Sequence, residues 1–316
     1  MGRYLARLNT DKIQTEAGMR VFVTGATGYI GTAVSEALAA AGHQVIGLAR
    51  SDASAEQLRG QGAEVRRGEL SDEATLRNAA AAADATIHLA ATGDARTGEL
   101  DRAAVAAMLD ALRGSGKAFV YTSGVWVMPE TPEGPADEDT PLDPAPLVAW
   151  RPAVEELALA AADDGVRSVV VRPAMVYGRG GGIVAMLVRS ARDDGAARMV
   201  GDGGNRWSFV HVDDLADLYV QVVEEPPAGE VLLAASGEPR RVREVAEAAS
   251  QSGGAGGEVE AVPLEQARQK LGSIADALTR DQWVVGDRAR ERLGWHPHRP
   301  DVIEELKQGS YAGAAR

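Results

Sequence analysis

The sequence contains no cysteine, few aromatic residues and no long apolar run. Without cysteine, disulfide bonds, thiolate nucleophiles and cysteine-ligated zinc sites are excluded. No apolar segment approaches the roughly 20 residues of a membrane-spanning helix. The first residues are polar and lack the apolar core of a signal peptide, so we interpret residues 1–18 as a loose extension ahead of the folded chain. We expect a cytoplasmic protein without a membrane partner.

Lysine is also scarce in this chain, and acidic residues outnumber basic ones by 46 to 33. The formal net charge is −13 over 316 residues, and Lys12, Lys117, Lys270 and Lys307 are the only lysines. Such an acidic protein repels phosphate backbones, which argues against nucleic acid as a partner. We expect a small-molecule partner instead. Any anionic cofactor must then be held by helix N-termini and a few arginines.

Short apolar runs alternate with longer amphipathic stretches in the first half of the chain. The apolar runs predict strands at Val21–Thr24, Gln44–Leu48, Glu64–Arg66, Ala85–Leu89, Ala118–Thr122 and Ser168–Val171. The amphipathic stretches predict helices at Tyr29–Ala41, Ala53–Gly60, Asp72–Ala81, Leu100–Arg113 and Val148–Ala162. This alternation indicates an α/β fold, a Rossmann-type doubly wound parallel sheet over residues 19–173 that binds a dinucleotide.

The second half of the chain, residues 174–316, is less regular and richer in glycine. Ligands of doubly wound sheets bind beyond the carboxyl ends of the strands. We therefore expect this half to form mainly a small C-terminal substrate lobe over those ends, with some segments returning to the Rossmann domain.

A glycine-rich turn lies between the first predicted strand and the first predicted helix. It places Gly25, Gly28 and Gly31 at the spacing of a dinucleotide-binding turn. The first glycine permits a tight turn, the second lets a pyrophosphate approach the backbone, and the third lets helix and strand pack closely. Because the helix that follows begins with unpaired N–H groups, its N-terminus suits phosphate.

Further motifs follow this turn in a fixed order. They occupy Gly68–Asp72, Ile87–Ala91, Val120–Ser123, Val171–Gly178 and Phe209–Ala216. Together with Thr-Gly-Ala-Thr-Gly-Tyr-Ile-Gly at 24–31, this set resembles the extended short-chain dehydrogenase/reductases, the NAD-dependent epimerase/dehydratase-like group. The resemblance runs from about residue 19 to residue 305, which is nearly the whole chain.

The resemblance implies a nicotinamide cofactor and an active-site serine, Ser123, at the end of the fifth strand. The residues that it places around the cofactor are Gly25, Thr27, Gly28, Tyr29, Ile30, Gly31, Arg50, Ser51, Glu69, Leu70, Leu89, Ala90, Ala91, Arg151, Pro173, Met175 and Val176.

The end of the second strand indicates which nicotinamide cofactor is used. An acidic residue there binds the ribose hydroxyls of NAD, whereas arginine accommodates the 2′-phosphate of NADP. Here Arg50 and Ser51 follow the strand, and a guanidinium matches phosphate in a bidentate manner. The alternative is a solvated Arg50 with Asp52 on the ribose. We favour NADP(H) over NAD(H).

The usual catalytic pair of the group, Tyr-x-x-x-Lys, is absent. No tyrosine lies between Tyr121 and Tyr177, and Lys117 precedes the fifth strand, at the end of the sheet away from the cofactor. Aligning the glutamates at 155 and 156 with the one that usually follows the lysine places Arg151 at the lysine position and Leu147 at the tyrosine position. The alternative register places Trp150 and Val154 there. We favour the first register because it keeps a cation beside the nicotinamide ribose.

Three functions compete on this evidence. The first is an NADP(H)-dependent oxidoreductase that reduces a small or medium, hydrophobic carbonyl, enone or imine compound with a non-standard proton donor. Its candidate catalytic residues are Ser123, Tyr177 and Arg151. The second is an NADP(H)-binding sensor or regulatory module without turnover. The third is a non-redox isomerase, lyase or cyclase on the same fold. We take the first as the working hypothesis, because the cofactor turn and Ser123 are both present.

Large apolar groups fall in loops that are expected near the substrate. The substrate-contact candidates are Asp94, Trp126, Met128, Trp150 and Trp207, although the aromatic residues suit a packed core equally well. His211 precedes two aspartates, but no second histidine lies at ligand spacing, so we predict no metal. Many members of the group dimerise through helices of the nucleotide domain, which makes a homodimer a further expectation.

Overall fold

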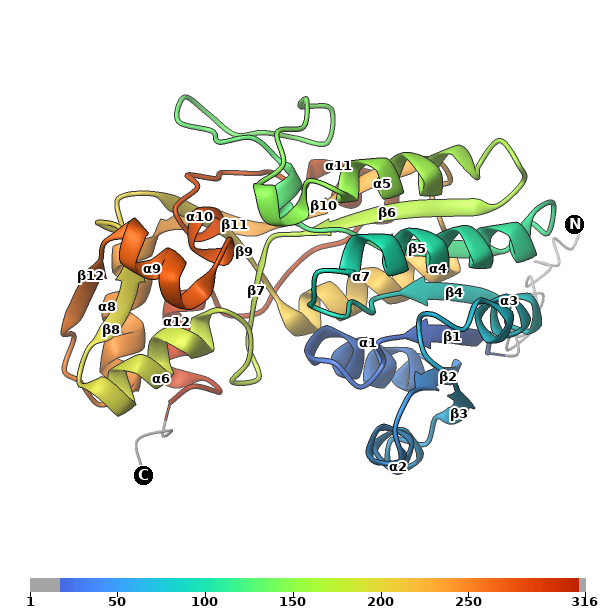
Figure 1. Cartoon of the computed structure of the whole chain (residues 1–316), viewed down its shortest axis with the longest axis horizontal. Coiled ribbons are helices and arrows are strands. Elements are labelled where there is room, and N and C mark those ends of the chain that lie inside the picture. The colour runs from blue at the N-terminus through green and yellow to red at the C-terminus, as the bar shows by residue number, and fades with distance from the viewer. Residues whose placement is uncertain (1–17, 313–316) are drawn as a thin grey trace, which may run out of the picture.

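The computed structural model describes residues 18–312, so the extension expected at residues 1–18 lies outside the described residues except for Gly18. Figure 1 shows two parts: a sheet with helices on both faces, and a smaller lobe beside it. Within residues 18–312, no helix is long and apolar enough to cross a membrane.

A sheet of seven parallel strands forms the larger part. In spatial order its strands are β10 (Glu230–Ala234), β6 (Arg167–Pro173), β5 (Ala118–Thr122), β4 (Ala85–His88), β1 (Arg20–Thr24), β2 (Gln44–Ala49) and β3 (Glu64–Arg67). Successive residues alternate between two cores: Val21 and Val23 face one side, and Phe22 faces the other. This order confirms the predicted Rossmann-type sheet, with β10 added from the second half of the chain.

Helices cover both faces of the sheet. One face carries α3 (Glu73–Ala82), α4 (Thr97–Leu112) and α5 (Arg151–Ala160). The other carries α1 (Tyr29–Ala40), α2 (Asp52–Gly60), α7 (Val212–Glu224) and α11 (Asp287–Leu293). Most boundaries agree with the prediction to within two residues. Two starts differ by three residues: α4 begins earlier than predicted and α5 later. The shift at α5 has a local reason, because Pro146–Val148 form a separate 3-10 turn and Pro152 occupies the first turn of the helix, where its missing N–H is not needed.

The lobe is built from two small sheets and five helices. Its strands are β7 (Met175–Tyr177), β9 (Arg206–His211) and β11 (Ser236–Arg241) in one sheet, and β8 (Ala197–Val200) and β12 (Val259–Val262) in the other. Its helices are α6 (Val184–Asp194), α8 (Val242–Ser252), α9 (Leu264–Leu271), α10 (Ile274–Leu278) and α12 (Val302–Gln308). Because β7 follows β6 after a single residue, the lobe begins directly at the carboxyl end of the main sheet.

The proline-rich segment of residues 129–146 is fixed to the lobe rather than free. Thr131 N donates to Asp281 O over 2.8 Å, and Ala136 N donates to Trp283 O over 2.9 Å. Leu233 N donates to Glu138 Oε1 over 3.0 Å, which ties the segment to β10 as well. Its end, at Pro146, therefore has a defined position beside α5.

Candidate active site

The N-terminus of α1 is free of any side-chain cap within the described residues. Ser51, Asp72, His211 and Asp301 cap α2, α3, α7 and α12, whereas the other helices, like α1, have no side-chain cap in the described residues. The first N–H groups of α1 therefore lack side-chain acceptors and carry the positive end of the helix dipole. This arrangement suits a pyrophosphate.

The three glycines of the turn allow this close approach. Gly25 has φ +72°, in the left-handed region that favours glycine, and a Cβ there would lie 2.8 Å from Ala90 N. A Cβ on Gly31 would lie 2.0 Å from Gly25 O. Any side chain at either position would push the turn away from the sheet. Gly31 thus shapes the site without lining it.

A cleft of about 370 Å³ opens in front of this turn. It is lined by Gly25, Thr27, Gly28, Leu48, Arg50, Ser54, Gly68, Glu69, Leu70, Ser71, Leu89, Ala90, Ala91, Thr92 and Leu100. Nine of the predicted cofactor residues lie here together. The cleft combines backbone N–H groups with a mixed polar and apolar wall, which suits the adenosine and pyrophosphate part of a dinucleotide.

The charges around β2 leave an arginine, and no aspartate, facing the cleft. Arg50 lines it, whereas the Asp52 carboxylate is paired with Arg67 Nη2 over 2.6 Å and does not line it. Ser51 also does not line the cleft, because its hydroxyl accepts from Ser54 N over 3.2 Å as the cap of α2. Ser54 lines the cleft in its place.

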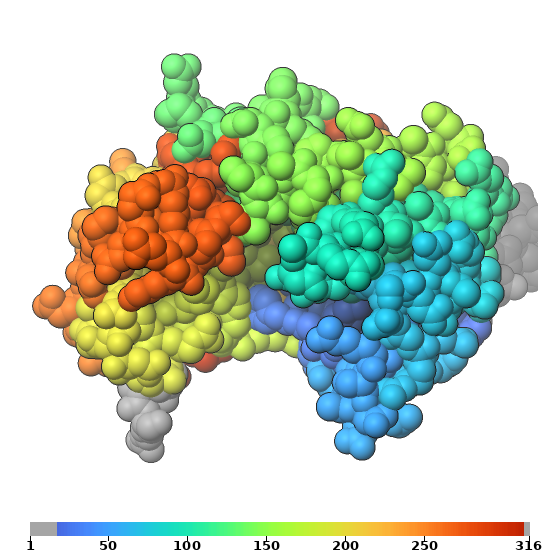
Figure 2. Space-filling model, viewed as in Figure 1, coloured from blue at the N-terminus to red at the C-terminus, as the bar shows by residue number. Residues whose placement is uncertain are grey.

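A second cavity of about 670 Å³ continues between the sheet and the lobe. Figure 2 shows the surface hollowed between these two parts. The predicted residues among its lining are Tyr29, Ile30, Asp94, Ser123, Trp126, Trp150, Arg151, Pro173, Met175 and Val176. Its apolar wall also includes Leu147, which the favoured register places at the tyrosine position, and residues that the sequence did not indicate, among them Val148, Ile183 and Ile274. A cavity of this size and apolar character suits a hydrophobic small molecule.

Ser123 is a polar group in this cavity with no partner of its own. The residue is 7% exposed, and its Oγ has no hydrogen-bond partner in residues 18–312. A buried hydroxyl without a partner is costly. Ser123 lines the cavity at the end of β5, so a ligand oxygen there would satisfy the hydroxyl once the side chain rotates toward the cavity.

Arg151 supplies positive charge beside Ser123. Its Nη1 donates to Thr122 O over 2.8 Å and to Tyr121 Oη over 3.3 Å, which fixes the guanidinium at the end of β5. Its Cζ lies 4.6 Å from the centre of the Trp150 ring. The half-buried guanidinium thus has N–H groups left for a ligand in the cavity.

The structure does not bring Tyr177 to the cavity. Its side chain is 1% exposed, and its hydroxyl donates to Pro300 O over 2.6 Å. Burial raises the pKa of this hydroxyl well above its usual value. The tyrosine that does line the cavity within the described chain is Tyr29, whose hydroxyl donates to Gly178 O over 2.8 Å. This placement argues against the predicted role of Tyr177 as proton donor.

Two of the predicted substrate contacts are core residues. Met128 is 0% exposed, and its sulfur lies 3.3 Å from Arg172 Nη1. Trp207 is 4% exposed, and its Nε1 donates to Leu278 O over 3.2 Å. Neither lines the cavity, so for these two residues the core interpretation holds and substrate contact does not. Trp126 and Trp150 do line it.

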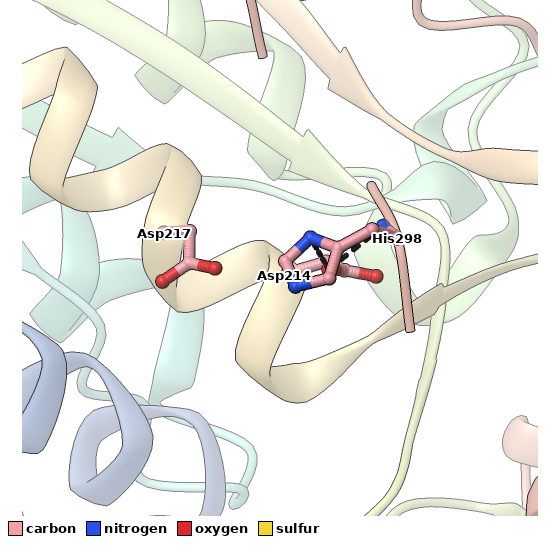
Figure 3. A group of neighbouring side chains, drawn as sticks. All are labelled: Asp214, Asp217 and His298. Carbon is pink, nitrogen blue, oxygen red and sulfur yellow. Dashed lines mark hydrogen bonds and ion pairs between the residues drawn. The ribbon is translucent and has the colours of Figure 1, made fainter. Parts of the chain in front are cut away.

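The aspartates after His211 anchor the chain near its C-terminal end. Asp214 Oδ1 accepts from His298 N and Oδ2 accepts from Arg299 N, both over 3.1 Å. Figure 3 shows the His298 ring beside this carboxylate, with Asp217 one turn further along α7. Because the backbone already occupies both oxygens of Asp214, the group is explained as a structural anchor.

Comparison with known protein families agrees with this geometry. Residues 21–235 match the model of the NAD dependent epimerase/dehydratase family. The chain belongs to this family. It is 33% identical over 297 residues to an uncharacterized protein of Saccharomyces cerevisiae, covering 92% of this chain and 98% of that one.

Two further comparisons extend this result. The chain is 30% identical over 327 residues to the 4-hydroxy-2-methyl-3-oxo-4-farnesyl-3,4-dihydroquinoline-1-oxide ketoreductase of Stigmatella aurantiaca, covering 93% of this chain and 98% of that one. Among solved structures, it resembles the Thermus thermophilus UDP-glucose 4-epimerase in complex with NAD, with a TM-score of 0.75, 23% identity and coverage of 94% and 100%. The family uses nicotinamide cofactors, and the protein is an NAD(P)-dependent enzyme of the short-chain dehydrogenase/reductase type.

The residues present fit such a cofactor. The uncapped start of α1 and the cradle formed by Gly25 and Gly28 would hold the pyrophosphate, and the Gly25 position leaves no room for a Cβ. The cleft and the second cavity adjoin after β4, where Thr92 lines the cleft and Gly93 lines the cavity, and the unpartnered Ser123 lines the cavity at the end of the neighbouring β5. The nicotinamide half would reach this end of the site.

Proposed function

We propose that this protein is an NADPH-dependent reductase of hydrophobic carbonyl compounds. The observation that carries the proposal is the Ser123 hydroxyl, which is buried without a partner on a residue that lines the apolar cavity next to the dinucleotide cleft. A carbonyl oxygen is the acceptor that this donor lacks.

The chain's own residues would stabilise the negative charge that develops on this oxygen. When bound, the nicotinamide supplies a hydride to the carbonyl carbon. Ser123 donates a hydrogen bond to the oxygen, and Arg151 lowers the energy of its negative charge. Arginine stays protonated in proteins, so it stabilises charge without supplying the proton. Water that enters the open side of the cavity is then the source of the proton.

The preference for NADPH rests on Arg50. It lines the cleft beside Ser54 and Ser71, whereas Asp52 is held by Arg67 outside the cleft. A guanidinium with nearby hydroxyl groups matches a 2′-phosphate, while the carboxylate that would bind the ribose hydroxyls of NAD is engaged elsewhere.

The substrate class rests on the cavity wall. Trp126, Trp150, Leu147, Ile183 and Ile274 surround the approach to Ser123. Such a wall favours a ketone with a large apolar substituent, and the ketoreductase of Stigmatella aurantiaca is named for a farnesyl-bearing 3-oxo compound.

The experiment is NADPH oxidation with a series of 3-oxo compounds whose alkyl chains lengthen stepwise, with NADPH titrated on the same sample. We expect turnover whose KM falls as the chain lengthens, and a lower rate with NADH. Tight NADPH binding without turnover across the series would favour a sensor, and a lack of NADPH binding would overturn the proposal.

A further inference from the structure

Behind Arg151, a continuous chain of polar side chains runs through the core under the site. Arg151 Nη1 lies 3.3 Å from Tyr121 Oη, which lies 2.8 Å from Asp101 Oδ2. Asp101 Oδ1 lies 3.2 Å from His88 Nε2, and His88 Nδ1 lies 2.7 Å from Thr24 Oγ1. Thr24, His88, Asp101 and Tyr121 are each at most 2% exposed.

The direction of each hydrogen bond can be assigned from the ends of this chain. Thr24 Oγ1 accepts from Leu89 N and Ala90 N, so its own proton is left for His88 Nδ1. His88 is then neutral, and its Nε2–H donates to Asp101. Burial raises the pKa of Tyr121, which keeps its hydroxyl protonated and donating to the same carboxylate. The Tyr121 oxygen is left to accept from Arg151.

This assignment leaves the Asp101 carboxylate with two neutral donors and no direct cation within the part of the chain described. A buried charge of this kind is costly unless an opposite charge compensates it. The nearest cation in the network is Arg151, which is linked to the carboxylate through the Tyr121 hydroxyl. Asp101 and Arg151 thus form an ion pair that Tyr121 mediates, with the guanidinium at the cavity and the carboxylate in the core.

We propose that Asp101 is a positioning residue that acts through Tyr121 to hold Arg151 against the nicotinamide half of the cofactor. The inference rests on the proposed function and deepens it. In Asp101→Asn, the amide offers one acceptor oxygen in place of two and no negative charge, so it cannot accept from His88 and Tyr121 as the carboxylate does, and the Tyr121 hydroxyl is no longer held with its lone pair toward Arg151. The guanidinium then keeps one bond, to Thr122 O, and its stacking on Trp150.

The test compares two ligands by calorimetric titration. NADP⁺ contains the nicotinamide ribose, whereas adenosine 2′,5′-bisphosphate contains only the adenosine end. Asp101→Asn and Tyr121→Phe should each weaken NADP⁺ by about tenfold, the loss of one hydrogen bond to a charged group. Binding of the bisphosphate should not change. Asp110→Asn, the same substitution at an exposed position of α4, is the matched control and should change neither.

Arg151→Ala supplies the decisive comparison. In that background, Asp101→Asn should have no further effect on NADP⁺, because its action passes through the guanidinium. Equal losses for the two ligands, unchanged NADP⁺ binding in both single variants, or a full additional loss in the Arg151→Ala background would overturn the inference. If Asp101→Asn does not fold, Tyr121→Phe decides by the same criteria. A wild-type protein that binds neither ligand would overturn the proposed function, and this inference with it.

Discussion

Two hydroxyl groups near the end of the main sheet have opposite surroundings. Ser123 lines the cavity and its buried Oγ has no partner among the described residues, whereas Tyr177 Oη is fully engaged by Pro300 O. Removing either group changes the protein by a single oxygen. Variants that remove one oxygen at each position therefore distinguish an effect on the rate of the reaction from an effect on the free energy of unfolding.

Ser123→Ala should lower kcat/KM by about 100-fold, the usual loss for a donor to a developing oxyanion. Its NADPH affinity should be unchanged. Tyr177→Phe should leave kcat unchanged and lower the free energy of unfolding by about 1 kcal/mol, because the Pro300 carbonyl loses its donor. Steady-state kinetics and urea unfolding of both variants check this. A tenfold loss of kcat in Tyr177→Phe would restore the tyrosine as proton donor.

At the same scale, the proposed preference for NADPH can be tested at Arg50. Arg50→Ala should weaken NADPH by at least about tenfold while leaving NADH within about twofold, because only NADPH carries the 2′-phosphate. Arg59→Ala, an exposed arginine of α2 outside the cleft, is the control. Titration of both cofactors gives the result, and equal losses for NADPH and NADH would contradict it.

The starts of α1 and α7 differ in whether a side chain closes them. The start of α1 has no side-chain cap, and Gly28 occupies the cap position. The start of α7 is closed by His211, whose Nδ1 accepts from Asp213 N over 3.1 Å. A protonated imidazole cannot accept this bond. The capped helix is therefore sensitive to pH.

Burial lowers the pKa of His211 below its usual value, against the opposing effect of Asp213 and Glu305. Below about pH 6.5 the unfolded chain then binds more protons than the folded one, so the free energy of unfolding falls as the pH drops. His211→Asn keeps an acceptor at the cap without this titration. The stability difference between wild type and variant should therefore be smaller at pH 5.5 than at pH 7.5 in urea unfolding. An equal difference at both pH values would exclude His211 as the cause.

Elements and the cofactor turn could be predicted because their signals are local. The strand β5 begins and ends as expected, and the spacing of Gly25 from the glycines that follow it was enough to predict the turn. The placement of Tyr177 could not be predicted, because it depends on Pro300, 123 residues further along the chain. The burial of Asp101, by contrast, could have been predicted from its position in the sequence. Asp101 lies among Ala104, Val105, Met108 and Leu112 on the buried face of α4, where a charge is out of place.

At the scale of the whole molecule, the cavity joins both halves of the chain. Gly93, Ser123 and Arg151 come from the sheet part, whereas Ile183 and Ile274 come from the lobe. Neither half encloses a substrate alone. We therefore expect the lobe to determine which substrate binds and the end of the sheet to determine the reaction.

Ile274 tests this division of roles. It is 37% exposed and lines the cavity, so Ile274→Glu should raise the KM for long-chain ketones by at least about tenfold, the cost of placing a charge in an apolar wall. Its NADPH affinity should not change. Met186→Glu is a matched control, since Met186 is also 37% exposed but lies on α6 outside the cavity wall. Equal KM values for Ile274→Glu and wild type would place the substrate elsewhere.

The last strand of the main sheet has a consequence for how the protein is made. Through β10, Val169–Pro173 of β6 are paired on the side away from β5. A chain that stopped at residue 173 would expose this apolar strand as an open edge, which invites aggregation. During synthesis, the nucleotide-binding half therefore cannot close its sheet until Ala234 has left the ribosome, and the first part of the lobe must emerge before it.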